Sequence, residues 1–140
     1  ANPELPSKYV LQKLLIEEIH TLVVGHTPIG ELPVVISDGK FRILFMDNSA
    51  SHYRSAASTV ISGGSIKVKS AFRPDPNGPA LSYEHILGAE TTVGRKTELG
   101  WIIAPYKDQI LTVNIEKAQN YKISYSLAPN PNKCLNFYKN

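Results

Sequence analysis

The sequence predicts an α+β, mainly β fold, in which one N-terminal amphipathic helix leads into a buried strand and then into antiparallel hairpins. Residues 7–20 carry the only clear helical pattern of the 140-residue chain. After Gly25 the spacing of apolar residues changes to two, which is typical of strands with one face in the core. Two turn signals, Asp38-Gly39 and Gly63-Gly64, separate runs that are rich in β-branched and aromatic residues. Such signals indicate hairpins of a sheet with one face toward solvent.

The predicted helix is amphipathic. Its apolar face consists of Val10, Leu11, Leu14, Leu15 and Ile19, which follow the helical period. Ser7 is expected to cap the first turn through its hydroxyl. His20 is expected at the last turn, where a cation stabilises the helix dipole. Residues 21–24 follow directly and are apolar and partly β-branched, which indicates a short buried strand that ends at Gly25.

The helix is predicted to be followed by about eight short strands in all. Hairpins are predicted over 34–47 and 58–72, and further strands over 81–87, 101–106, 109–115 and 121–127. The stretch 73–79 contains three prolines and an Asn-Gly pair, so it is a loop and a candidate boundary. This predicts two units, residues 1–72 and residues 73–140.

Composition limits the classes of partner. The 15 basic and 12 acidic residues leave a net charge of +3, and the basic residues are scattered, which argues against a nucleic-acid partner. The apolar runs are far shorter than the roughly 20 residues that a membrane-spanning helix needs. A single cysteine, Cys134, excludes an intramolecular disulfide and favours a reducing compartment such as the cytoplasm.

The tetrapeptide Gly25-His26-Thr27-Pro28 is the most informative motif. A histidine placed directly after a strand is held rigidly and can present a neutral imidazole nitrogen to a metal ion. From the residues alone, a structural loop histidine remains the alternative, because one imidazole does not make a metal site. Asp47, at the end of a later predicted strand, is the best candidate for a second site residue, since carboxylates there often bind metals or orient imidazoles.

The stretch Tyr9 to Gly30, YVLQKLLIEEIHTLVVGHTPIG, resembles the helix, buried strand and GHTP loop in the late part of calcineurin-like metallophosphoesterases, a superfamily of binuclear-metal phosphatases. The strand FRILFMD, the polar loop from Asn48 and the strands STVIS and SIKVKSAF continue the resemblance to about Phe72. It implies that His26 is a ligand to one of two divalent ions (Mn, Fe, Zn or Mg). It also implies that the hairpins form part of a metallophosphoesterase-type β-sandwich.

Other motifs of that superfamily are missing. Asp-x-His, Gly-Asp-x-x-Asp and Gly-Asn-His-Glu do not occur in the chain, and Pro28 stands where many relatives have a second histidine. The proline matches the phosphoprotein phosphatase-like branch. The chain begins at Ala1 and its one methionine is Met46. We therefore expect the C-terminal part of a longer or two-chain phosphatase, whose N-terminal catalytic segment or companion chain carries the remaining ligands.

The implied function is hydrolysis of phosphomonoesters, with phosphoproteins as candidate substrates, and this chain alone is not expected to be active. Residues at the rim of the site, or in contact with a substrate phosphate, would be Gly25, Thr27, Asp47, Asn48, His52, Tyr53 and Arg54. The alternative is a non-catalytic β-rich module for binding or assembly. It is favoured by the aromatic residues of the second half, which include Trp101, Tyr106 and Tyr125, because exposed aromatics often mark recognition surfaces.

Overall fold

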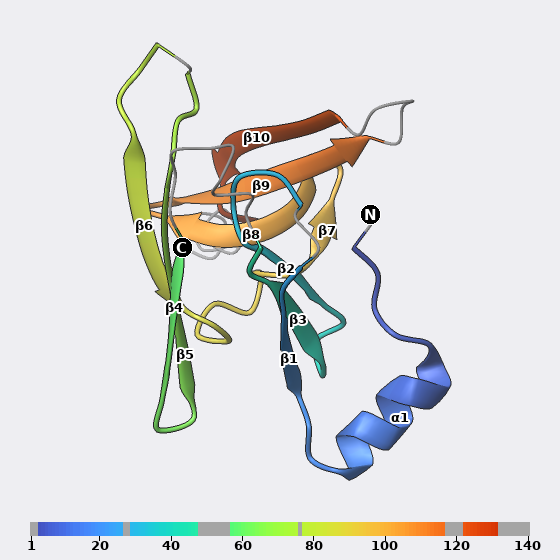
Figure 1. Cartoon of the computed structure of the whole chain (residues 1–140). Coiled ribbons are helices and arrows are strands. Elements are labelled where there is room, and N and C mark those ends of the chain that lie inside the picture. Colours follow the sequence, from blue (N-terminus) through green and yellow to red (C-terminus); the bar gives the residue numbers. More distant parts are fainter. Residues whose placement is uncertain (1–2, 27–28, 48–56, 76, 117–121, 132–140) are drawn as a thin grey trace, which may run out of the picture.

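The computed structural model describes residues 3–26, 29–47, 57–75, 77–116 and 122–131. In this part the chain is mainly β with one short helix, and most strand pairs are antiparallel (Figure 1). The helix is α1 (Lys8–Ile16), and the strands are β1 (Thr21–Val24), β2 (Val34–Ser37), β3 (Arg42–Phe45), β4 (Ser58–Ser62), β5 (Ser65–Phe72), β6 (Leu81–Ile86), β7 (Lys96–Thr97), β8 (Gly100–Tyr106), β9 (Gln109–Glu116) and β10 (Lys122–Pro129). The predicted mainly β class is confirmed.

Three sheets make up the described part. Their strand orders are β1-β3-β2, β4-β5-β6 and β10-β9-β8-β7. Strand β8 links them, because it lies against both β2 and β6. In Figure 1 the long β4-β5-β6 ribbons stand along one side, and α1 lies at the opposite side beyond β1. No helix of the described part has the length and apolar character needed to cross a bilayer.

The helix begins as predicted and ends early. The Ser7 hydroxyl accepts a hydrogen bond from the Val10 N–H at 3.5 Å, and α1 ends at Ile16 rather than at His20. The reason is a Schellman motif, in which Glu18 adopts a φ of 59° and its N–H donates to the Leu15 carbonyl oxygen. This end of the helix was not predicted from the sequence, because a glutamate rather than the usual glycine occupies the left-handed position.

The predicted capping role of His20 is therefore wrong. His20 lies beyond the end of α1, with its Nδ1 3.4 Å from the carbonyl oxygen of Lys40. The predicted burial of residues 21–24 is met only in part: Leu22 and Val24 are half-buried against the core, whereas Val23 is 41% exposed. The cause is sheet order: β1 is an edge strand that pairs only with β3 in the described structure.

Both predicted hairpins are confirmed. β2 pairs with β3 and β4 pairs with β5, each antiparallel, around the Asp38-Gly39 and Gly63-Gly64 turns. One Asp38 carboxylate oxygen accepts from the N–H groups of Lys40 and Phe41, each at 2.8 Å. These hydrogen bonds, that from Phe41 above all, hold the pKa of Asp38 below its usual value. The turn is thus fixed by a charged side chain as well as by glycine.

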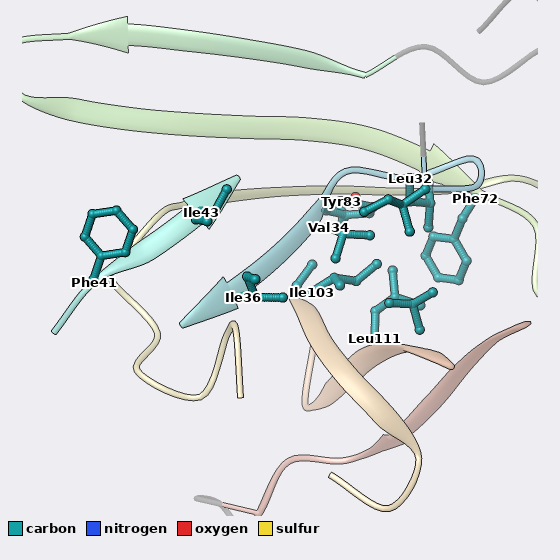
Figure 2. Close-up of a cluster of buried hydrophobic side chains, with 12 residues drawn as sticks. Leu32, Val34, Ile36, Phe41, Ile43, Phe72, Tyr83, Ile103 and Leu111 are labelled. Carbon is teal, nitrogen blue, oxygen red and sulfur yellow. The ribbon is translucent and has the colours of Figure 1, made fainter. Parts of the chain in front are cut away.

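The strands predicted beyond residue 80 correspond to β6, β8, β9 and β10. The two-residue strand β7 was not predicted, because so short a strand leaves no periodicity in the sequence. The division at residue 72 stays a prediction. One buried cluster contains residues from both sides of it, including Val34, Ile103 and Leu111 (Figure 2). Leu32, Val34 and Leu111 are essentially inaccessible to solvent.

Candidate functional site

The two segments predicted to carry site residues leave the β1-β3-β2 sheet at the same edge, the one formed by the carboxyl ends of β1 and β3. β1 and β3 are parallel, with Val24 opposite Phe45, so Gly25-His26 and Met46-Asp47 both follow the carboxyl ends of neighbouring strands. The Met46 N–H donates to the Val24 carbonyl oxygen at 2.9 Å, which extends the pairing to the point of exit. Ligand sites in sheets with parallel strands gather at such edges. This edge is the candidate site.

His26 has an unusual backbone conformation. Its φ is 62°, in the left-handed region, which costs a non-glycine residue about 1–2 kcal/mol. Its side chain is exposed. Strained residues of this kind often mark functional sites. Gly25, by contrast, has open space where a Cβ would lie among the described atoms, so nothing in that part of the chain requires glycine there.

The segment that follows the candidate loop is anchored in the core. Ile29 and Leu32 are 2% and 0% exposed. The Tyr125 hydroxyl oxygen of β10 accepts from the Glu31 N–H at 2.8 Å and from the Leu32 N–H at 3.2 Å. Gly30 permits this approach, since its φ is +73° and a Cβ there would lie 2.5 Å from the same hydroxyl. The second half of the chain therefore fixes the path of the residues that lead away from His26.

Replacing Tyr125 with phenylalanine should lower the free energy of unfolding by about 1–3 kcal/mol, because the partly buried N–H groups of Glu31 and Leu32 lose their acceptor. Urea unfolding measures the change. The control is Tyr9→Phe, since Tyr9 is 65% exposed and should tolerate the loss of its hydroxyl. Equal midpoints for wild type and Tyr125→Phe would show that this hydroxyl does not hold the loop.

The described residues do not supply a complete metal site. They contain no group of three or more His, Cys, Asp or Glu side chains placed to hold an ion. His26 and Asp47 are the two donor-bearing predicted residues that the structure describes, and one edge carries both. The predicted site residues Thr27, Asn48, His52, Tyr53 and Arg54 lie outside the described residues. Any ion at this edge would need ligands from elsewhere.

No protein-family model, curated protein or solved structure matches this chain.

A buried polar cluster away from this edge was missed by the sequence reasoning. Ser70, Tyr83 and His85 lie on one face of β5 and β6 and are 4%, 5% and 7% exposed. The Ser70 and Tyr83 hydroxyls and both ring nitrogens of His85 have no hydrogen-bond partner among the described residues. Burial lowers the pKa of His85 to about 4 and raises that of Tyr83. The alternation of Tyr83, His85 and Leu87 was the signal that His85 would face inward.

Proposed function

We propose that this chain is the C-terminal portion of a binuclear-metal phosphatase of the calcineurin-like superfamily, phosphoprotein phosphatase-like branch, and that His26 is its one ligand to the metal centre. The parallel pairing of β1 with β3 carries the proposal, because it brings the two resembling segments, Gly25-His26 and Met46-Asp47, to one sheet edge. In this proposal the antiparallel sheets form part of a metallophosphoesterase-type β-sandwich.

The residues at this edge have distinct roles in the proposal. His26, with its left-handed φ of 62° directly beyond β1, holds an ion through its imidazole together with ligands of another segment. Asp47, at the neighbouring strand end, orients that imidazole or lies at the rim. The chemistry that two divalent ions supply in such enzymes is activation of a water and clamping of the phosphate oxygens.

The exposed edge strand supports the need for a companion segment. β1 is an edge strand whose outer side is unpaired in the described structure, and such an edge can pair with another chain. Val23 is 41% exposed, and α1 beside it leaves Tyr9 65% and Ile16 78% exposed. The N-terminal catalytic segment or companion chain would cover this side and bring the missing ligand motifs to His26.

The test compares hydrolysis of an aryl phosphate, with Mn²⁺ added, by the chain alone and by the chain joined to the polypeptide that carries the missing motifs. We expect no hydrolysis by the chain alone, because one imidazole does not hold a divalent ion against water. In the assembled protein, His26→Gly should lower kcat/KM by at least about 10- to 100-fold, the loss that is common even for a residue that only hydrogen-bonds to a metal ligand. Glycine is chosen because it adopts the φ of 62° without strain.

His20→Gly is the matched control, since His20 and His26 are both exposed and flank β1 at opposite ends. Its activity should equal that of the wild type. His26→Gly should fold at least as stably as the wild type, which separates loss of a ligand from loss of structure. Unchanged turnover in His26→Gly at saturating Mn²⁺ would remove the phosphatase proposal and leave the β-rich binding module in its place.

A further inference from the structure

A pocket lies where residues 3–5 pass beside β7, β8 and β9. Its volume is about 550 Å³, within the range of small-molecule sites. Trp101 of β8 forms one wall, and Leu5 and Ile115 add apolar surface. We call it the Trp101 pocket.

The wall is held in place by the sheet. Trp101 pairs with Val113 of β9 and with Lys96 of β7. The Lys96 ammonium lies 5.6 Å from the centroid of the indole ring, a cation–π contact that restricts the ring. Gly100, with φ at +112°, lets β8 approach the Val113 carbonyl closely. The Trp101 side chain is therefore a preformed, half-buried surface rather than a mobile one.

The polar groups around this surface indicate the class of ligand. Glu4, Lys96 and Asn114 contribute one anion, one cation and one amide to the lining. A strongly charged ligand would meet one charge of its own sign, whereas a neutral polyhydroxyl ligand can use all three groups as donors and acceptors. An indole wall favours a ligand with an apolar face. A pyranose ring has both properties, an apolar C–H face and hydroxyls around its edge.

We propose that the Trp101 pocket binds a neutral saccharide, with one pyranose ring packed against the Trp101 indole beside the Lys96 ammonium and its hydroxyls hydrogen-bonded by Lys96, Asn114 and Glu4. This site is independent of the proposed phosphatase centre. It gives the chain a binding function that does not require His26 to hold a metal.

Trp101 is the one tryptophan of the chain, so tryptophan fluorescence reports on this pocket alone. Titration with maltose, cellobiose and N,N′-diacetylchitobiose should give a saturable change with at least one of them, with a millimolar dissociation constant. Isothermal calorimetry on the same sugar should return the same constant without relying on the indole. Glucose 6-phosphate should bind more weakly than the neutral sugar. The His26→Gly variant should bind the sugar as the wild type does.

Lys96→Gln and Asn114→Leu should each raise the dissociation constant, Lys96→Gln by about 10-fold, because a charge-assisted hydrogen bond is lost. Lys107→Gln is the matched control: its ammonium lies 5.5 Å over the Tyr106 ring, a similar contact that does not line the pocket. No saturable signal with any of the three sugars would overturn the proposal. An equal loss in Lys107→Gln, or tighter binding of the phosphorylated sugar, would also overturn it.

Discussion

Replacing Gly100 with alanine is expected to lower the free energy of unfolding by roughly 3 kcal/mol or more. Two effects add: a φ of +112° is strained for any residue with a Cβ, and the new methyl group would overlap the carbonyl oxygen of Val113. The pairing of β8 with β9 begins at the next residue, with Trp101 opposite Val113, so moving Gly100 away from the Val113 carbonyl would disturb the end of this ladder. Urea unfolding followed by far-UV circular dichroism measures the change.

Gly39→Ala separates the two effects. Gly39 has a comparable φ of +93°, but nothing lies within 4 Å of the position that a Cβ would take. This variant should therefore show the backbone strain alone, about 1–2 kcal/mol. If both variants lost the same stability, the close approach of β8 to Val113 would not hold in solution.

Acidification is expected to destabilise the fold through His85 before the carboxylates titrate. Burial lowers the pKa of His85 from 6.5 to about 4, so the folded state binds fewer protons than the unfolded state between these values. Above pH 6.5 the ring is neutral in both states and burial of His85 carries no protonation cost, whereas the cost grows as the pH falls to about 4. The full difference corresponds to roughly 3 kcal/mol. Urea unfolding at a series of pH values measures it.

His85→Phe should abolish this loss while keeping a ring against Tyr83, whose centroid lies 6.1 Å from that of the imidazole. It should not destabilise the protein at neutral pH, because it also removes two buried ring nitrogens without partners among the described residues. Asp38→Asn is the contrasting variant. The pKa of Asp38 is lowered from 3.8, so its contribution is lost only at more acidic pH, and the loss between 6.5 and 4 should persist. A pH dependence in His85→Phe like that of the wild type would contradict this assignment.

Local chemistry made much of the fold predictable. The Asp38-Gly39 and Gly63-Gly64 turns and the alternation along β5 depend on neighbouring residues, and their strands appear in the predicted places. The end of α1 and the edge position of β1 did not follow from the sequence. The helix ends early because Glu18 adopts a left-handed conformation that glycine usually adopts. The position of β1 at the side of its sheet depends on pairing with a strand distant in sequence.

The candidate site was predictable in part. The GHTP motif placed His26 after a strand, and Asp47 was expected at the end of another, but their meeting at one edge depends on the parallel β1-β3 pairing, which no local pattern specifies. The Trp101 pocket was not predicted, because it combines residues 3–5 with strands about 100 positions later in the chain. The inward direction of His85 could be read from its alternation with Tyr83 and Leu87, but its grouping with Ser70 depends on the pairing of β5 with β6.

The most direct test of the central claim is electron spin echo spectroscopy of Mn²⁺ bound to the assembled protein, which detects nitrogen coupled to the metal ion. If His26 is a ligand, the wild type shows imidazole nitrogen couplings that weaken or disappear in His26→Gly and persist unchanged in His20→Gly. Identical nitrogen couplings in the wild type and His26→Gly would contradict the claim that this chain supplies a metal ligand.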